Sequence, residues 1–311
     1  MTYFNEMQQV SAERMRRLAS LELETRKQPR NPVSGFITAI KELREHRNLL
    51  GLLVRREVVG RYKDSVLGFA WSLIRPLTQL LIYYLVMGQF LGAARSIENF
   101  AVYIFTGLTL YSLFSETLTA MTGSIIANAG LVKKVYLPRE IFPLATLGSS
   151  LFNFVLQMVI LIAAAAFTGS LTLGWHLMYG VVAVIVILLY ATGLGLILAS
   201  TNVYFRDVQY LVEVLMMLLM WFSPIVYSWT FVHDAFVSFG VPWLTEIYVN
   251  NPVTLAVLGF QVAFWSPSSP TAEFPPELMT RMGISIIFGL LLVWFGQRIF
   301  ARLQGNFAQE L

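Results

Sequence analysis

The residues of this chain that could do chemistry gather in the segment Asn128–Leu144, with the sequence NAGLVKKVYLPREIFPL. It carries a lysine pair, Lys133 and Lys134, followed by Pro138 and Arg139, and it separates two apolar stretches that are each long enough to cross a bilayer. A cationic, proline-broken loop in this position favours contact between a membrane protein and a component of the cytosol. The alternative is a solvated turn whose lysines only set the orientation in the membrane, and sequence physics leaves both interpretations open.

Groups for metal binding or covalent catalysis are sparse. The chain contains no cysteine, and its three histidines, His46, His176 and His233, are far apart in the sequence. A metal site needs several convergent ligands, so we expect neither a metal site nor a histidine-based catalytic centre. A glycine-rich nucleotide motif ending in Lys-Ser or Lys-Thr is also missing from the sequence. If ATP and Mg²⁺ drive this protein, we expect them to bind to a partner chain.

Three ionisable side chains fall inside apolar stretches: Arg75, Glu116 and Glu213. A charge inside the bilayer is costly and is a functional hypothesis by default, yet both glutamates lie near the ends of their stretches. We therefore expect a structural Arg–Glu pair that holds helix ends together rather than a proton relay. Most aromatic side chains of these stretches should be anchors in lipid, and a minority could line a passage and stack on sugar rings. The candidates for this lining are Tyr83, Tyr103, Tyr111, Phe114, Trp221 and Phe222.

The composition is that of an integral membrane protein. Hydrophobic residues make up 56 % of the chain, charged residues only 13 %, and the mean hydropathy is +0.64. A hydrocarbon core of about 30 Å takes about 20 helical residues. The apolar runs are continuous and lack the alternation of barrel strands, so we expect an all-α fold with six transmembrane helices. The expected spans are Val66–Leu91, Phe100–Met121, Ile141–Phe167, Trp175–Leu198, Val208–Tyr227 and Met282–Phe300.

The distribution of positive charge predicts the orientation in the membrane. Of the 22 lysines and arginines, 19 fall on one side of the expected spans, whereas only Arg95 and Arg281 fall on the other and Arg75 lies within a span. Positive residues favour the cytoplasmic side, so both termini of this multi-pass protein are expected in the cytoplasm. The net charge of +4 reflects this topology, and nucleic-acid binding is an unnecessary explanation of it. No signal peptide is visible before the first apolar run.

Three regions follow from these patterns. Residues 1–30 are polar and are expected to form a flexible cytoplasmic head, and residues 66–311 form the expected membrane domain. Residues 31–65 predict an amphipathic helix that lies in the membrane interface or packs on a soluble partner, with Arg55, Arg56 and Arg61 among its cations. Between the last two spans, the apolar run Val253–Trp265 is too short to cross the bilayer. This run predicts an exterior re-entrant or interfacial helix.

Several stretches, in this order along the chain, resemble the membrane (permease) subunit of bacterial type 2 ABC exporters for polysaccharides, O-antigens and teichoic acids. The matching stretches are RREVVGRYKDSVLGFAWSLIRPL at 55–77, SIIANAGLVKKVYLPREIFPL at 124–144, NVYFRDV at 202–208, FSPIVY at 222–227, the pair Asn251-Pro252 and the closing FARLQGNFAQEL. Each motif is weak alone, but the ordered set with matching topology covers nearly the whole chain from Leu49 onward. Arg75 has no assigned place in the family's pattern, so its role stays open.

The resemblance implies a half-transporter of the bacterial cytoplasmic membrane, that is, a transport subunit that is not itself an enzyme and has no catalytic residue. Two copies would form a channel as a homodimer, two copies of a cytosolic ABC ATPase would dock beneath it, and a lipid-linked glycan polymer would be the substrate, with no nucleic acid involved. A short coupling helix over 124–132, ended by Gly130, and a second cytoplasmic loop would meet the ATPase. The contact residues implied are Ser124, Ile125, Asn128, Leu131, Val132, Asn202, Arg206 and Asp207.

The same resemblance places Lys133, Lys134, Pro138 and Arg139 at the cytoplasmic entrance. There the three cations could bind a lipid-linked pyrophosphate or phosphodiester group, because such groups are natural partners of cationic donors.

Three other classes of membrane protein are alternatives to a polysaccharide exporter. A small-molecule or lipid exporter of the same superfamily would share the spans, and the segment 124–144 favours the polymer branch. A membrane-embedded glycosyltransferase would need carboxylates or histidines clustered at one membrane face, whereas the exterior acids are dispersed. A secondary transporter would need coupling charges near the midplane and usually an internal repeat. O-antigen, galactan, capsule and teichoic acid all stay open as the polymer, as does the type of cell envelope.

Overall fold

The structure, a computed structural model, describes residues 32–63, 70–95, 97–135, 137–269 and 271–311. The chain divides into two compact units, residues 1–38 and residues 39–311. Of the first unit the structure describes residues 32–38, which begin helix α2 (Pro32–Glu45). The expected cytoplasmic head lies outside the described residues, and so does the start of the expected first span, residues 66–69.

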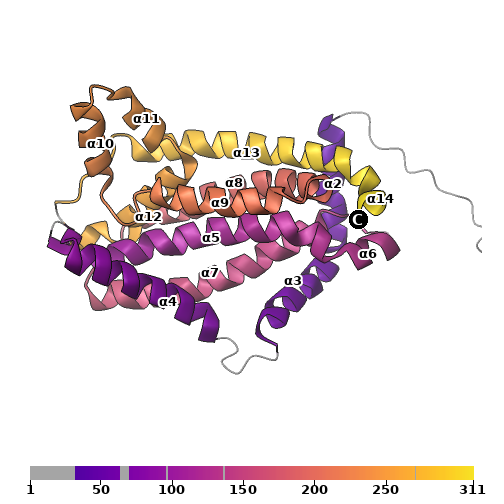
Figure 1. The fold of residues 1–311 in the computed structure, drawn as a ribbon, viewed down its shortest axis with the longest axis horizontal. Helices are drawn as coiled ribbons and strands as arrows, with labels where there is room; N and C mark the ends of the chain where they lie inside the picture. The colour runs from indigo at the N-terminus through magenta and orange to yellow at the C-terminus, as the bar shows by residue number, and fades with distance from the viewer. Residues whose placement is uncertain (1–31, 64–69, 96, 136, 270) are drawn as a thin grey trace, which may run out of the picture. The chain divides into compact units, whose positions relative to one another are not determined.

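Every regular element among the described residues is a helix, which confirms the expected all-α fold for that part of the chain. The longer helices of the second unit are α3 (Arg47–Tyr62), α4 (Trp71–Tyr83), α5 (Phe100–Ala127), α7 (Ile141–Phe167), α8 (Leu177–Tyr204), α9 (Val208–Trp221), α10 (Trp229–Ser238), α12 (Pro252–Phe264) and α13 (Leu278–Leu303). Shorter helices are α6 (Ala129–Lys134), α11 (Trp243–Val249) and α14 (Phe307–Glu310), and a π-helical segment, Tyr84–Phe90, continues α4. Helices α5, α7, α8, α9 and α13 run along a common direction (Figure 1).

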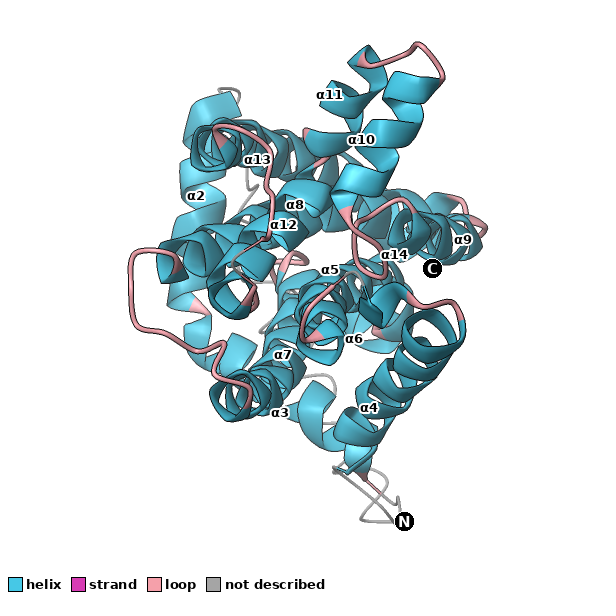
Figure 2. Ribbon diagram, turned by 90° about the vertical axis from the view of Figure 1, so that its left-hand side faces the viewer, coloured by secondary structure: helices cyan, strands magenta, loops and turns pink. Residues whose placement is uncertain are grey.

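Helix α5 lies in the middle of the second unit, where it contacts α4, α7, α8, α9 and α12 (Figure 2). Its sequence is apolar on all sides, and a helix of this kind is buried all round. Ile104, Leu110 and Met121 on α5 are fully buried. Helix α8 also contacts α12 and α13, so α5 and α8 together carry most of the packing.

The expected spans coincide with helices, but their lengths differ. Among the described residues, three helical runs are long and apolar enough to cross a membrane, Ile141–Phe167, Leu177–Tyr204 and Leu278–Glu310, and the bent pair α11–α12 makes a fourth if it counts as one span. The three long runs match the third, fourth and sixth expected spans. Helix α9 is apolar but has only 14 residues. The first and second expected spans correspond to α4 with its π-helical extension and to α5. The count of six therefore stays a prediction, while the multi-pass character rests on the three long runs.

The expected amphipathic helix region over residues 31–65 consists of two helices, α2 and α3, and its place in the membrane interface stays a prediction. The helix breaks at His46, whose backbone leaves helical geometry (φ −94°, ψ 17°) and whose Nδ1 lies 2.8 Å from the carbonyl oxygen of Glu42. Helix α3 contacts α7, and Leu53 on α3 is buried. Val54 lies so close to Gly148 of α7 that a Cβ at Gly148 would sit 2.6 Å from it. Part of the apolar stripe therefore packs on protein.

Helix α12 corrects the expectation of an interfacial helix over Val253–Trp265. It begins where the sequence indicates, because the Asn251 side chain accepts a hydrogen bond of 2.9 Å from the Val253 backbone and Pro252 follows as the first helical residue. Nearly every residue of the helix is buried against α5, α8 and α13, because apolar faces of these neighbours surround it. Helices α11 and α12 meet at an angle of 73°, and the re-entrant arrangement stays a prediction.

Small residues let the backbones of α8 and α13 meet. A Cβ added to Gly296 would lie 2.3 Å from the carbonyl oxygen of Gly193, and a Cβ added to Gly193 would lie 2.9 Å from the carbonyl carbon of Leu292. Glycine at a helix contact lets two backbones approach closely. Such contacts are common in membranes, because there the hydrophobic effect does not favour helix–helix contact over helix–lipid contact.

Candidate functional site

The cationic loop lies at the end of the second unit where α6, the loop after α8 and α14 come together. We call this region the α6 end. Helix α5 ends at Ala127 because Asn128 turns out of the helix, with φ −107° and ψ 20° and its Nδ2 donating to the carbonyl oxygen of Ser124 at 2.8 Å. Side chains that bond the preceding backbone in this way compete with helix continuation. Helix α6 then runs to Lys134. The prediction that Gly130 ends this helix is wrong, because Gly130 is an exposed residue inside α6.

The structure divides the expected ATPase-coupling residues into two groups. Five of them are buried and pack beneath the surface of the loops: Ser124, Ile125, Asn128, Val132 and Asn202. Leu131, Arg206 and Asp207 are exposed.

The two loops of the α6 end are joined by hydrogen bonds. The Asn202 side chain donates to the Thr122 carbonyl at 3.0 Å and accepts from the Gln209 backbone at 3.2 Å. These bonds hold the loop after α8 against the end of α5, beside α6. The exposed residues of both loops therefore belong to one region of the surface.

Two exposed apolar residues at this end were missed by reasoning from the sequence. Phe205, between Asn202 and Asp207, is 70 % exposed, and Val135, directly after α6, is 47 % exposed. The signal for Phe205 was present, because this aromatic residue directly precedes two charged residues, Arg206 and Asp207, inside the motif NVYFRDV. An apolar side chain that stays exposed next to charged residues is typical of a protein contact.

The structure separates the predicted entrance cations into an exposed pair of lysines and an arginine that is held against an aromatic ring. Lys133 and Lys134 are exposed at the end of α6. Arg139 is partly buried, and its guanidinium carbon lies 5.7 Å from the centre of the Phe307 ring, a cation–π distance. Pro138 lies beside it, and its carbonyl accepts the backbone N–H of Ile141 at the start of α7.

The C-terminal segment also belongs to this end. Phe307 of α14 is fully buried and meets the fully buried Phe300 ring edge-on, with centroids 5.5 Å apart. Helix α14 contacts both α6 and α8, and Tyr204 donates to the Leu303 carbonyl at 2.7 Å. Figure 1 shows α6 and α14 side by side. The C-terminus therefore supports the cationic loop through Phe307 and Arg139.

A buried carboxylate stands next to the entrance cations. Glu140, at the start of α7, is buried, and this burial raises the pKa of its carboxyl group. Gln297 donates to Glu140 Oε1 across 3.4 Å, and Arg298 donates to Gln297 Oε1 at 2.8 Å. Glu140 was not among the sequence candidates, because its burial depends on α13 lying across the start of α7.

The expected Arg–Glu pair exists, but with a different arginine. Glu116 of α5 forms its ion pair with Arg61 of α3 and also accepts a hydrogen bond of 2.6 Å from Asn153 of α7. The pair therefore ties three helices together. Glu213 Oε1 accepts a hydrogen bond of 3.2 Å from Gln209, and Arg75 forms no ion pair within the described part of the chain.

The other two interface-helix arginines remain at the surface of α3. Arg56 pairs with Glu57 at 2.7 Å and also donates to the Asn128 side chain, which links α3 to the loop before α6. Arg55 is exposed.

Half of the proposed channel-lining residues are buried inside the protomer, which corrects their expected position. Tyr103, Tyr111 and Phe114 are all buried on α5. Tyr103 donates to the carbonyl of Tyr227 at 2.6 Å, and Tyr111 donates to the carbonyl of Met216. Their hydroxyl groups therefore fasten α9 and the turn after it to α5.

The other three lining candidates are more accessible. Trp221 and Phe222 are exposed at the end of α9, and Tyr83 of α4 meets Trp221 edge-on, with ring centroids 6.3 Å apart. These residues lie where α4 and α9 approach each other.

Bundled apolar helices that are long enough to cross a bilayer, with a cationic loop and a C-terminal support at one end, are typical of a multi-pass membrane protein. In the described residues no group of three His, Cys, Asp or Glu side chains could hold a metal ion. The chain belongs to the ABC-2 type transporter family, whose family model matches residues 48–265. It is thus the membrane component of a transporter whose ATP hydrolysis takes place in a separate ATPase subunit.

Several bacterial relatives match most of the chain. The O-antigen export system permease protein RfbA of Myxococcus xanthus is 28 % identical over 276 residues, which are 89 % of this chain and 100 % of that protein. The capsule polysaccharide export inner-membrane protein CtrC of Neisseria meningitidis serogroup B is 26 % identical over 255 residues, 79 % of this chain and 90 % of that protein. A polysialic acid transport protein KpsM of Escherichia coli is 24 % identical over 188 residues, 56 % of this chain and 68 % of that protein.

Proposed function

We propose that this chain is the membrane subunit of an ATP-driven exporter that moves a lipid-linked polysaccharide across the cytoplasmic membrane. The observation that carries the proposal is the match to an O-antigen export permease along that protein's whole length. Capsule polysaccharide permeases match nearly as much of the chain, so the shared feature of these relatives is export of a long glycan. O-antigen and capsule-like polymers are therefore the substrate classes favoured, ahead of teichoic acid.

The working unit in this proposal is a homodimer with two copies of a cytosolic ATPase. A single copy of the chain buries most of α5 and leaves α4 and α9 at its surface, with Trp221 and Phe222 exposed. Two such surfaces facing each other would enclose a passage lined by both copies. Both termini and the α6 end lie in the cytoplasm, as the excess of lysine and arginine on that side supports.

The ATPase contact in this proposal is the exposed surface of the α6 end. Leu131, Val135 and Phe205 supply apolar contact area, and Arg206 and Asp207 supply charges around it. The buried residues Ser124, Ile125, Asn128, Val132 and Asn202 keep this surface in place. A push on α6 would be passed to α5, because only Asn128 separates the two helices.

The entrance in this proposal is formed by Lys133, Lys134 and Arg139. Lys133 and Lys134 are free to reach a phosphate group at the membrane surface, because both are exposed. Arg139 is held by Phe307 and is therefore pre-oriented. Helix α3 contributes Arg55 as a further exposed cation near headgroups.

The proposal is tested by depleting the chain in its native bacterium. We expect export of one surface glycan to stop and the lipid-linked form of that glycan to accumulate in the cytoplasmic leaflet, with both effects reversed by a plasmid copy. Unchanged surface glycans after depletion would contradict the proposal. Robust ATPase activity of the chain purified alone would contradict the assignment of ATP hydrolysis to a separate subunit.

A further inference from the structure

The turn at residues 222–227, which follows α9, is closed by hydrogen bonds from its own side chains. The Ser223 hydroxyl donates to the carbonyl oxygen of Leu219 at 2.8 Å, and the Tyr227 hydroxyl donates to the carbonyl oxygen of Trp221 at 2.6 Å. Ser223 is fully buried. Helix α9 begins directly after the loop that belongs to the α6 end, so this turn lies at the opposite end of the helix.

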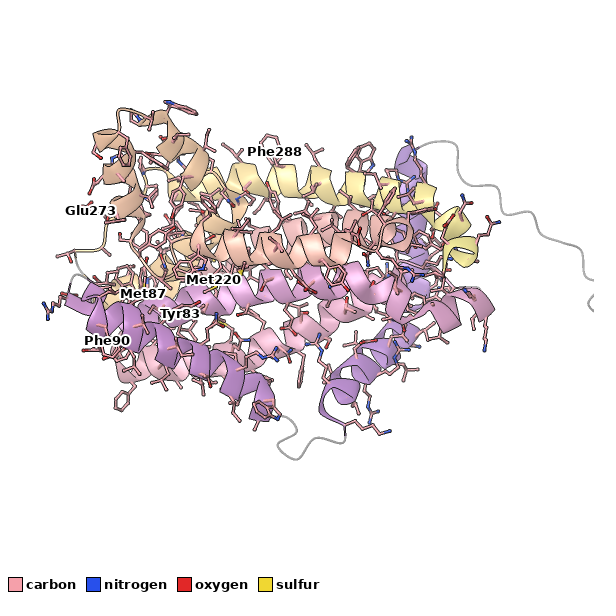
Figure 3. The ribbon with its side chains drawn as sticks, viewed as in Figure 1. Tyr83, Met87, Phe90, Met220, Glu273 and Phe288 are labelled. Atoms are coloured by element: carbon pink, nitrogen blue, oxygen red, sulfur yellow. The ribbon has the colours of Figure 1, made fainter. Side chains whose placement is uncertain are left out.

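Two aromatic side chains stay exposed where α9 meets this turn. Trp221 and Phe222, which we call the aromatic pair, are 49 % and 64 % exposed, whereas the next four residues of the turn are buried. The Trp221 ring meets Tyr83 of α4 edge-on. Figure 3 shows Tyr83 beside Met220, the residue that precedes the pair. The aromatic pair therefore lies on the surface that α4 and α9 form together.

Two buried side chains from neighbouring helices hold the carbonyl groups of the turn. Tyr103 of α5 donates to the Tyr227 carbonyl at 2.6 Å and lies 3.0 Å from the Pro224 carbonyl. Gln261 of α12 donates through Nε2 to the Pro224 carbonyl at 2.8 Å. A hydroxyl has one hydrogen, and its shorter contact is to Tyr227, so Gln261 is the main donor to Pro224. The turn is thus fastened by α5 at Tyr227 and by α12 at Pro224.

The Pro224 carbonyl needs this donor. Pro224 follows the end of α9, so its carbonyl lies beyond the hydrogen-bond ladder of that helix, and the residue is buried. A buried carbonyl without a partner costs free energy comparable to a lost hydrogen bond. Without Gln261, this carbonyl would keep only the longer contact with Tyr103, and the backbone would be held less tightly three residues from Trp221.

Gln261 is an exception within α12. The sequence of this helix, PVTLAVLGFQVAF, has two polar side chains, Thr254 and Gln261, and Gln261 is 1 % exposed. A buried amide is costly unless it forms hydrogen bonds, and an apolar residue of the same shape would fill the space equally well. Packing alone therefore does not account for glutamine at this position, whereas the bond to the Pro224 carbonyl does.

We propose that Gln261 is a positioning residue for transport, which fixes the aromatic pair relative to α12 by holding the Pro224 carbonyl. The inference rests on the proposed function, in which the surface of α4 and α9 faces the passage for the glycan. Gln261 is buried and acts through the turn, without contact to the glycan. Aromatic rings that are held in place offer a moving sugar chain a contact surface whose ordering requires little further loss of entropy.

The hold on the turn is measured with single cysteines, since the chain contains none of its own. Ser223→Cys places a thiol at a fully buried position of the turn, and Ser200→Cys places one at a fully buried position of α8. Membranes of the depleted strain that carry each tagged chain are treated with a maleimide dye, and the chain is then purified. Adding Gln261→Met, which removes the donor and keeps the side-chain length, should speed labelling in the Ser223→Cys chain about fivefold. Labelling in the Ser200→Cys chain should not change.

Transport is measured in the chain without added cysteine, as surface glycan exported relative to ATP hydrolysis by the purified complex. Gln261→Met should lower this ratio severalfold at an equal amount of chain in the membrane, because the partner subunit that hydrolyses ATP is untouched. A general loss of folded protein would lower the amount of chain instead. Tyr103→Phe should lower the ratio as well, because it releases the turn at Tyr227.

Gln157→Met on α7 is the matched control. Gln157 is a buried glutamine, and its side-chain oxygen has no hydrogen-bond partner among the described residues. The same substitution there should change neither the labelling in the Ser223→Cys chain nor the ratio of export to ATP hydrolysis. Equal effects of Gln157→Met and Gln261→Met would overturn the inference. Faster labelling in the Ser200→Cys chain as well would mean a general loosening and would overturn it too.

The two readouts separate a positioning role from a role in stability. Faster labelling in the Ser223→Cys chain with an unchanged ratio of export to ATP hydrolysis would make Gln261 a residue of the fold alone, and would overturn the inference. Unchanged labelling would do the same. Continued glycan export after depletion of the whole chain would contradict the proposed function itself. A block of export on depletion, together with a normal ratio for Gln261→Met, would overturn only the inference about Gln261.

Discussion

The contact between α8 and α13 offers a sharp test of the packing. In Gly296→Ala the added methyl carbon would lie 2.3 Å from the carbonyl oxygen of Gly193. An ordinary carbon–oxygen contact is about 3.3 Å, so the helices must separate by about 1 Å at this point. The clashing atom belongs to the backbone, and no change of rotamer relieves it. Gly283→Ala on the same helix is the matched control, because nothing lies within 4 Å of its added carbon.

The two substitutions should have opposite effects on stability. Overpacking of a close contact costs about 1–3 kcal/mol. Alanine in place of a helical glycine returns up to about 1 kcal/mol. We therefore expect Gly296→Ala to lower the free energy of unfolding by about 1–2 kcal/mol, and Gly283→Ala to leave it unchanged or raise it slightly.

The measurement is thermal unfolding of each variant in the same detergent, followed by the recovery of monodisperse protein in size-exclusion chromatography. Gly296→Ala should lose monodisperse protein at a temperature several degrees below the wild type, and Gly283→Ala should not. Identical curves for the two variants would refute the inferred backbone contact between α8 and α13.

Two further predictions concern the α6 end and the topology. Lys134→Ala and Arg139→Ala should each reduce capture of an anionic lipid-linked glycan by about tenfold to a hundredfold, if a charge-assisted contact of ~1.5–3 kcal/mol is lost. Lys134→Ala gives the cleaner result, because Arg139 also contacts Phe307 and its loss would disturb packing as well as charge. Normal export by the double variant would mean that these charges only set the orientation of the protein in the membrane. Single cysteines introduced at Ala127 and Ser266 should react from the cytoplasmic and the exterior side, respectively. Labelling of both from one side would contradict the predicted topology.

The broad class of the protein could be predicted from the sequence because the relevant signals are local. Whether a run of apolar residues is long enough to cross a membrane can be read from the sequence of that run alone. The three runs Ile141–Phe167, Leu177–Tyr204 and Leu278–Glu310 could therefore be recognised as spans without knowledge of the tertiary structure. The cap formed by Asn251 and Pro252 is equally local, and the structure begins α12 where those two residues indicate. The ordered motifs between Arg55 and Leu311 identified the family for the same reason.

Burial of individual side chains was decided only by the tertiary structure. Tyr103, Tyr111 and Phe114 look the same in sequence as aromatics that face lipid or a passage. They are buried because α5 has neighbours on every side, and an apolar helix carries no pattern that shows which of its faces is covered. The interior position of α12 has the same origin.

The pairing of charges was likewise a matter of tertiary structure. The sequence indicated an Arg–Glu pair because an unpaired charge near the bilayer is costly, and that argument holds for any arginine within reach. The choice of Arg61 as the partner of Glu116 depends on α3 lying along α7, where Asn153 completes the cluster. Charge balance is therefore a property of composition and spacing, whereas the identity of each partner depends on which helix faces meet.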